Sequence, residues 1–170
     1  GRVPFSQMGD AITCGAGVYN FGVNAQENVN VEMAWSGENG GYGTLGFNED
    51  DMLAFDADLG EYAPVSGPVE SGQNVYFEKE YTQVLGPDRY TATFTTQSDA
   101  DYDGGEYDGD NSLTREFSVT QNEYSTDGIG VYSNPSITRL GTANFTDASD
   151  GFMMMSYYDI ANTTDVTGVT

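Results

Sequence analysis

Residues 90–120 read YTATFTTQSDADYDGGEYDGDNSLTREFSVT, and this stretch decides the fold of the chain. Before and after its acidic centre, apolar residues fall on alternate positions with threonines or polar residues between them. The alternating residues are Tyr90, Ala92, Phe94, Leu113, Phe117 and Val119. A two-residue period in β-branched and aromatic residues is typical of strands with one buried face. The stretch therefore predicts a strand, an acidic loop and a second strand.

The same period recurs in the rest of residues 3–120. Val29, Val31 and Met33 alternate with polar residues before Trp35, the only tryptophan, for which a core position is expected. Further strands are predicted over 3–8, 12–23 and 74–84, and residues 52–55 are a short apolar stretch. Roughly seven strands, with turn signals at short intervals, are typical of an Ig-like antiparallel β-sandwich. We therefore expect an all-β fold with one complete domain over residues 1–120.

Glycine-rich and acidic segments separate these strands. Residues 36–46, SGENGGYGTLG, are predicted to form a turn on composition alone. NEDD at 48–51 and DADLGE at 56–61 could hold a cation, although solvated loop charges are the commoner explanation. Tyr90 follows the tight turn LGPDRY, so its hydroxyl either donates back across that turn, as in a tyrosine corner, or its ring simply packs in the core.

The sequence changes character after Thr120. Residues 121–170 contain a glycine- and serine-rich stretch and the apolar run GFMMMSYYDI at 151–160, whose methionines favour a strand buried on both faces. Two or three strands cannot bury a core of their own. The segment must pack on the first domain, pair with another chain or belong to a larger, incomplete β domain. The final VTGVT stops within a β pattern, which favours the last two.

Charge and missing residue types narrow the function. The chain of 170 residues holds 27 acidic and 5 basic residues, a formal net charge of −22, which repels nucleic acid and anionic membranes. No transmembrane run is present, so membrane insertion is not expected. Because there is no histidine and Cys14 is the single cysteine, an intrachain disulfide, His/Cys zinc sites and histidine-dependent nucleophiles are excluded. Cys14 is expected to be a small buried residue. These exclusions favour a protein that is not an enzyme.

The loop at 99–110, DADYDGGEYDGD, is the candidate metal site. Its acidic residues are Asp99, Asp101, Asp103, Glu106, Asp108 and Asp110. Ca²⁺ takes six to eight oxygen ligands, and alternating aspartates with glycine at the bends resemble the start of an EF-hand loop. Asp110 stands at the twelfth position, where that loop has a bidentate glutamate, and no helices flank it. The sequence predicts Asp99, Asp101, Asp103, Asp108 and Asp110 as Ca²⁺ ligands, with a solvated loop as the alternative.

Four segments carry a resemblance to a known family. They are FSQMGD (5–10), VYNFGVNAQENVNVEM (18–33), DRYTATFTTQSDAD (88–101) and NSLTREFSVTQNEY (111–124). They resemble the Ig-like or fibronectin-type modules, including CARDB-type adhesion domains, of large secreted Bacteroidota surface proteins. Residues 124–145 look like the opening of the jelly-roll domain that commonly follows such a module. The resemblance implies a secreted or cell-surface location. The acidic loop is longer than the family implies, so its role is not inherited.

Three functions are consistent with these features of the sequence. The first is a non-catalytic structural or adhesive module of an extracellular multidomain protein or filament, whose partners are neighbouring domains or other copies of the same protein. The second is a carbohydrate-binding accessory module that stacks surface glycans on exposed tyrosines. The third is a fragment of a secreted hydrolase with its catalytic domain elsewhere. With 27 acidic residues, carboxylate pairs at glycosidase spacing arise by chance and do not distinguish these functions.

Overall fold

The computed structural model describes residues 1–99, 111–125, 158 and 160–168. In this part of the chain, nine strands and two single-turn 3₁₀ helices follow one another. They are β1 (Arg2–Pro4), η1 (Phe5–Gln7), β2 (Ile12–Tyr19), β3 (Asn30–Gly37), β4 (Tyr42–Phe47), η2 (Glu49–Asp51), β5 (Met52–Asp56), β6 (Glu61–Pro64), β7 (Asn74–Tyr81), β8 (Asp88–Gln97) and β9 (Ser112–Thr120).

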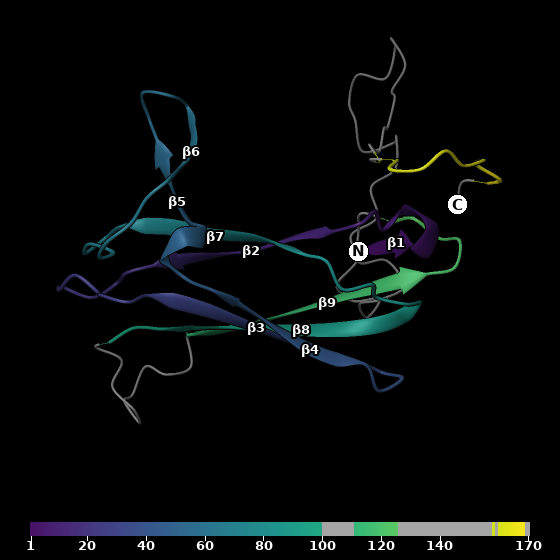
Figure 1. The fold of residues 1–170 in the computed structure, drawn as a ribbon, viewed down its shortest axis with the longest axis horizontal. Coiled ribbons are helices and arrows are strands. Elements are labelled where there is room, and N and C mark those ends of the chain that lie inside the picture. Colours follow the sequence, from purple (N-terminus) through teal and green to yellow (C-terminus); the bar gives the residue numbers. More distant parts are fainter. Residues whose placement is uncertain (100–110, 126–157, 159, 169–170) are drawn as a thin grey trace, which may run out of the picture.

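The strands form two sheets that pack face to face, which confirms the predicted all-β sandwich. One sheet has the order β1-β9-β8-β3-β4 and the other the order β2-β7-β5-β6. In Figure 1 they are the two layers of the molecule, and the β5–β6 hairpin rises from the four-stranded layer away from the other sheet. All pairs are antiparallel except β1 with β9, which is parallel.

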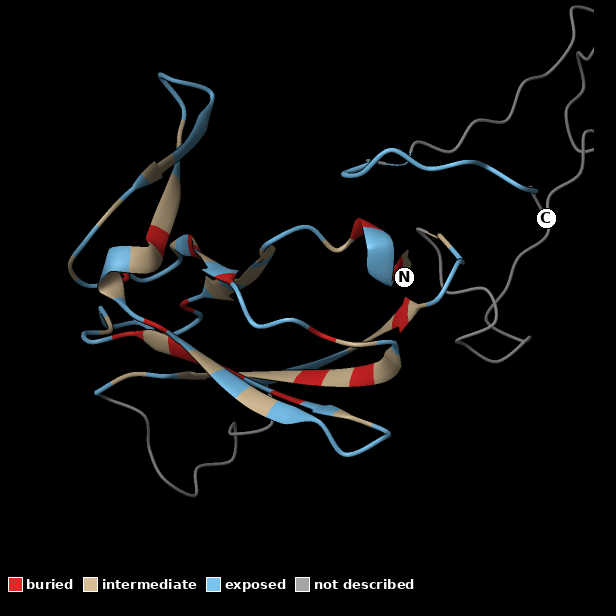
Figure 2. Ribbon diagram, turned by 45° about the vertical axis from the view of Figure 1, so that its right-hand side comes forward, coloured by how far each residue is buried: buried red, intermediate tan, exposed pale blue. Residues whose placement is uncertain are grey.

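The alternation seen in the sequence sorts side chains between core and solvent. Along β3 every second residue is buried, and so it is along β7 except at Lys79, which is half-buried; the buried positions face the space between the sheets (Figure 2). The buried apolar residues are Val29, Val31, Met33, Trp35, Phe47, Met52, Val69, Val75, Phe77, Tyr81, Leu85, Tyr90, Ala92 and Val119. Cys14 is half-buried against this core, and burial raises its pKa, so the thiol stays protonated.

Trp35 links the two sheets at the centre of the core. Its indole N–H, on the five-stranded sheet, donates to the hydroxyl of Tyr81 on the four-stranded sheet at 2.8 Å. The Trp35 ring also meets the Tyr90 ring edge-on, with centroids 5.6 Å apart. The predicted core position of Trp35 is confirmed, and the hydrogen bond satisfies both polar atoms inside the core.

Residues 36–46 are not turn alone, because their second half is strand β4. Glycine is needed at position 43 for a packing reason: a Cβ there would lie 2.8 Å from the indole nitrogen of Trp35. The true turn is at Gly40, whose φ of 95° lies in the left-handed region that favours glycine. Composition does not separate these two uses of glycine, so the prediction missed a strand of the sheet.

Two other segments differ from the prediction. Strand β1 ends at Pro4, and Phe5–Gln7 turn into a 3₁₀ helix in which the Met8 N–H donates to the Phe5 carbonyl at 3.3 Å. Residues 61–64 form β6, a strand that the sequence pattern did not predict. β6 exists because its partner β5 pairs with it over four positions, a long-range contact that no local pattern reports.

Tyr90 forms the predicted tyrosine corner. Its hydroxyl donates to the Gly86 carbonyl at 2.7 Å, across the turn that leads into β8, and its side chain is also buried. Burial, and after it the charge of Asp88, raises the Tyr90 pKa. The two interpretations of Tyr90 are therefore both satisfied by one side chain.

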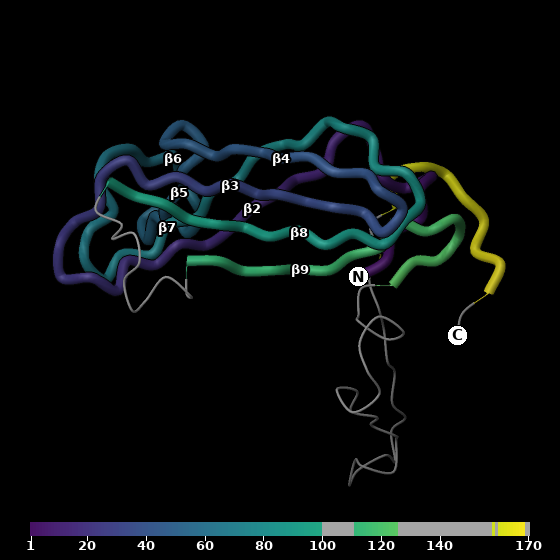
Figure 3. The backbone as a smooth tube through the Cα atoms, turned by 90° about the horizontal axis from the view of Figure 1, so that it is seen from below, coloured from purple at the N-terminus to yellow at the C-terminus, as the bar shows by residue number. Residues whose placement is uncertain are grey.

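The N-terminus and residues 160–168 lie at the same end of the sandwich (Figure 3). Beside β1, the backbones of Arg2 and Ser125 exchange two hydrogen bonds of 2.7 and 2.9 Å. The buried Gln7 side chain holds Asn162 by its backbone N–H and carbonyl, at 3.0 and 2.9 Å. Residues 160–168 therefore contact the sandwich at η1. Within the described residues, no helix has the length and apolar character to cross a membrane.

The packing of Trp35 on Gly43 predicts a sharp difference between two glycines of β4. Replacing Gly43 by alanine places a methyl group against the indole, and the free energy of unfolding should fall by about 1–3 kcal/mol. Gly46→Ala is the matched control, because a Cβ at Gly46 meets nothing within 4 Å. It should leave stability within about 0.5 kcal/mol or raise it slightly. Urea unfolding followed by Trp35 fluorescence measures both, and equal effects would contradict the packing.

Candidate functional site

The base of the acidic loop is the described part of the predicted metal site. The Thr96 N–H donates to the Asn111 carbonyl at 2.9 Å and closes the β8–β9 hairpin. Asp99 is held by the segment before β3: its N–H donates to the Glu27 carbonyl at 3.1 Å, and its carboxylate accepts from the Asn28 side-chain amide. Asn28 has a φ of 53°, a conformation that asparagine tolerates better than most residues.

The other predicted ligands lie outside the described residues. These are Asp101, Asp103, Asp108 and Asp110, together with Glu106. Within the described residues, no group of three or more acidic or cysteine side chains gathers as a metal site would require. The base does add one feature that the sequence did not show, because the backbone contact with Asp99 brings Glu27 next to the loop. The calcium prediction stays a prediction.

The two smaller acidic clusters have structural roles. In 48–51, Asn48 and Asp51 form a capping box around η2, and the Asp51 carboxylate pairs with Lys79 at 2.9 Å. In 56–61, the Asp56 carboxylate accepts from the backbone N–H groups of Asp58 and Leu59 and closes the β5–β6 turn. These contacts organise loops, as expected of solvated acidic turns.

Strand β4 is an open edge of the five-stranded sheet. Within the described residues it pairs only with β3, and its six residues, YGTLGF, include neither a charged residue nor a proline. The Gly46 carbonyl points away from β3 and accepts from the Lys79 ammonium at 3.3 Å. Backbone groups two residues apart point the same way in a strand, so the N–H and C=O groups of Tyr42 and Thr44 also face outward. This edge is a template for another strand.

Two of the other edges are protected. Beside β1, Ser125 occupies the outer side through its hydrogen bonds with Arg2. Strand β6 has four residues and ends at Pro64, which cannot donate to a further strand. Strand β2 is longer, at eight residues, and like β4 it contains two glycines and neither a charged residue nor a proline. In β4, the contact of the Gly46 carbonyl with Lys79 also shows which backbone groups face outward.

An aromatic cluster of Phe55, Tyr62 and Tyr76 lies on the outer face of the four-stranded sheet. The Phe55 and Tyr62 centroids are 5.7 Å apart with an interplanar angle of 71°, and those of Tyr62 and Tyr76 are 5.9 Å apart at 52°. Tyr76 lies over Gly15 of β2, where a Cβ would meet its hydroxyl at 2.2 Å. Phe55 and Tyr62, on the projecting hairpin, are 58% and 54% exposed.

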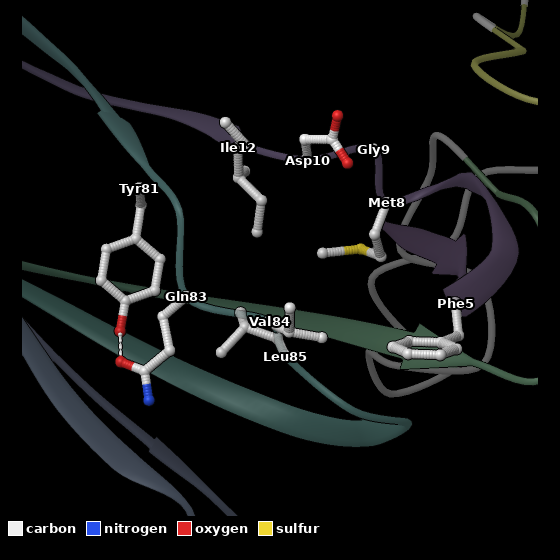
Figure 4. A pocket seen from close by; sticks show the side chains of 10 residues that line it. Phe5, Met8, Gly9, Asp10, Ile12, Tyr81, Gln83, Val84 and Leu85 are labelled. Atoms are coloured by element: carbon white, nitrogen blue, oxygen red, sulfur yellow. Dashed lines mark hydrogen bonds between the residues drawn. The ribbon is translucent and has the colours of Figure 1, made fainter.

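A small pocket of about 220 Å³ opens at the end of the sandwich near η1 (Figure 4). Its lining is mostly apolar and includes Phe5, Met8, Ile12, Val84 and Leu85, with Asp10 as the single carboxylate. On its wall, the Tyr81 hydroxyl donates to the Gln83 side chain. The lining supplies packing for an apolar group rather than a pair of carboxylates.

Comparisons with known proteins give no family to which the chain can be assigned. No family model matches the sequence, no curated protein is similar to it, and no solved structure matches its fold. The function of the chain is therefore inferred from the surfaces described above.

The calcium prediction can be tested on the whole chain by thermal unfolding in excess EDTA and in excess CaCl₂. Calcium at a hundred times its Kd would stabilise the fold by about 2.7 kcal/mol and raise the Tm by several degrees. The D103N/D108N double variant should lose that rise. The D50N/D58N variant removes the same charge from two exposed acidic residues of other loops and should keep it. A Tm of the parent chain that is equal in EDTA and calcium would contradict the prediction.

Proposed function

We propose that the chain is a non-catalytic structural or adhesive module of an extracellular protein, which joins other copies or neighbouring domains by strand addition at β4. The observation that carries this proposal is the open, uncharged edge at Tyr42 and Thr44. A strand laid beside β4 would satisfy these outward backbone groups and continue the five-stranded sheet. Backbone hydrogen bonds supply the affinity in this recognition mode.

Protection of the β1 edge supports an assembly role for β4 in particular. Unprotected edges lead to uncontrolled aggregation, so natural sheets cover or charge them. Ser125 covers the β1 edge, whereas β4 itself carries no charged residue, and the Lys79 ammonium covers one of its outward groups, the Gly46 carbonyl. An edge left open beside a protected one indicates a surface kept for pairing.

The terminal strands suit a module that bears tension. β1 and β9 are parallel, with Arg2 opposite Ser118 and Pro4 opposite Thr120. When Gly1 and the end of β9 are pulled apart, this pair is loaded in shear along its whole length, so its hydrogen bonds must break together. The Arg2–Ser125 bridge is antiparallel, so a pull on Gly1 and on the chain beyond Ser125 would open it before it loads this pair. Such a clamp fits a domain held between neighbours in a surface protein.

The extracellular location rests on the family resemblance and on charge. The four segments that resemble secreted Ig-like and fibronectin-type modules lie largely within the sandwich or next to it. A net charge of −22 keeps such a domain soluble and repels nucleic acid and anionic membranes, which agrees with protein partners at a cell surface.

The two alternatives receive less support from the described residues. Stacking of glycans favours exposed rings that lie in one plane, whereas neighbouring rings of the aromatic cluster are tilted to one another by 71° and 52°. A hydrolase fragment would place the chemistry in a domain outside this chain. Saturable binding of a neutral oligosaccharide, or turnover by the isolated chain, would favour these alternatives over the structural module.

The β4 proposal predicts self-association that depends on the Thr44 backbone. Sedimentation velocity of the full chain should show association that strengthens from low to 0.5 M salt, because salt screens the repulsion between acidic copies. Thr44→Pro removes the outward N–H without removing a hydrogen bond to β3, and it should abolish association. Thr44→Val keeps the backbone donor and should associate as the parent does.

Thr44→Lys provides a second way to block the edge, in case proline disturbs the fold. It should weaken association while the Tm of the dilute protein stays within a few degrees of that of the parent. A parent that is monomeric at every salt concentration, or association that survives both Thr44→Pro and Thr44→Lys, would contradict pairing at β4.

A further inference from the structure

We propose that the aromatic cluster binds the guanidinium and ammonium side chains of a basic polypeptide, with Glu78 as the anionic partner. The cluster is the contact face between the β5–β6 hairpin and the sheet: Tyr62 of β6 meets Tyr76 of β7, and Phe55 of β5 meets Tyr62. This site is on the opposite sheet from β4, so it is a second surface, independent of strand addition.

The orientation of the rings favours a cation over a flat ligand. Tyr76 lies against the backbone of Gly15, and the Tyr62 ring is tilted by 52° to it. The Phe55 ring is tilted by a further 71° to Tyr62. Rings tilted in this way form walls rather than a common plane. Alkylammonium and guanidinium groups are attracted to the faces of aromatic rings, and Phe55 and Tyr62 are exposed enough for solvent and ligands to reach them.

The charges on this face have one sign. Glu78 and Glu80 are exposed on β7, and alternation places them on the same side as Tyr76. The Tyr76 pKa is raised, first by burial and next by the charge of Glu78, so this carboxylate acts on the ring. Within the described residues, the only cation of the four-stranded sheet is Lys79, which alternation turns to the other side, where it pairs with Asp51. An incoming cation therefore meets negative charge and aromatic rings without a competing basic side chain.

The binding strength available favours a polypeptide over a free amine. One exposed ring strengthens the binding of a cation by about two- to fivefold. Two exposed rings and one carboxylate give a free ammonium ion only millimolar-range attraction at best. A chain with several basic side chains adds contacts with Glu80 and with the long-range field of a protein whose net charge is −22. The favoured occupant is therefore an arginine- or lysine-rich segment of another protein.

The test is a titration of the full chain with a nonaarginine peptide in 0.15 M salt, followed by calorimetry and by NMR shifts of the tyrosine rings. Variant F55A/Y62A removes the two exposed rings and leaves the net charge unchanged. Its Kd should rise about tenfold. Tyr62→Phe keeps the ring and should bind within twofold of the parent. Phe5→Ala removes a ring that is 44% exposed at η1, outside the cluster, and it is the matched control expected to change nothing.

Carboxylate variants separate local recognition from general charge. Glu78→Gln should weaken binding more than Glu49→Gln, which removes one charge from η2. Equal Kd values for the parent and F55A/Y62A would overturn the proposal, because attraction would then come from net charge alone. Equal losses in Phe5→Ala and F55A/Y62A would overturn it as well. Circular dichroism checks the fold of each variant. If F55A/Y62A unfolds the hairpin, the milder Tyr62→Leu replaces it and should still lower the affinity for the peptide.

Two further outcomes identify other ligands. Binding of neutral cellohexaose with no response to the peptide would replace the proposal by a glycan site. Saturation by tetramethylammonium at micromolar concentration would assign the cluster to a free quaternary amine instead. Peptide binding should weaken with added salt, whereas pairing at β4 should strengthen, so failure of one proposal is distinguishable from failure of the other.

Discussion

The hydrogen bond from the Trp35 indole to the Tyr81 hydroxyl is the interaction on which the two-layer arrangement depends. It crosses the interior between the sheets and gives both polar atoms a partner where water is absent. The surrounding packing is aromatic: Tyr90 meets Trp35 edge-on, and Phe117 stacks on Tyr90 with centroids 5.2 Å apart. Loss of the Tyr81 hydroxyl would leave the buried indole N–H unsatisfied, which costs more than the bond contributes. Loss of Trp35 costs less in this respect, because the Tyr81 hydroxyl keeps its bond to Gln83.

Large rings lying on glycines are a shared feature of the two sheets. Gly43 makes room for Trp35 on the inner face of β4, and Gly15 makes room for Tyr76 on the outer face of β2. A ring over a strand glycine restores the packing that the missing side chain would have supplied. In the core, Trp35 fills the space above Gly43 beside the edge strand β4. On the outer face, the packing of Tyr76 on Gly15 places the Tyr76 ring where the β5–β6 hairpin contacts it, and this contact forms the aromatic cluster.

The sequence predicted those parts of the fold in which local periodicity and burial agree. The alternation in β3, β7, β8 and β9 was sufficient to predict the strands and the sandwich, and Trp35 and the Tyr90 corner were anticipated from residue type and position. β4 and β6 were missed because glycine, proline and acidic residues indicate turns locally, whereas their strands depend on distant partners.

The candidate sites were less predictable for a related reason. The acidic loop was visible as a run of carboxylates, and Asp99 is the one predicted ligand whose contacts are described. The aromatic cluster could not be recognised, because Phe55, Tyr62 and Tyr76 come from three strands and read as ordinary core residues in the sequence. Only their register across β5, β6 and β7 shows that they share the outer face. Without the strand pairing, the positions of the tyrosines in the sequence do not show which of them share a face of the sheet.

Amide hydrogen exchange along β4, measured residue by residue on the dilute monomer and again at high protein concentration and salt, tests the central claim most directly. In the monomer, the amides of Gly43, Leu45 and Phe47 should be protected by β3, and those of Tyr42 and Thr44 should exchange quickly. On association, Thr44 should become protected as well. Fast exchange throughout residues 42–47 would show that β4 is a loop, and protection of Thr44 in the monomer would show that its edge is already covered.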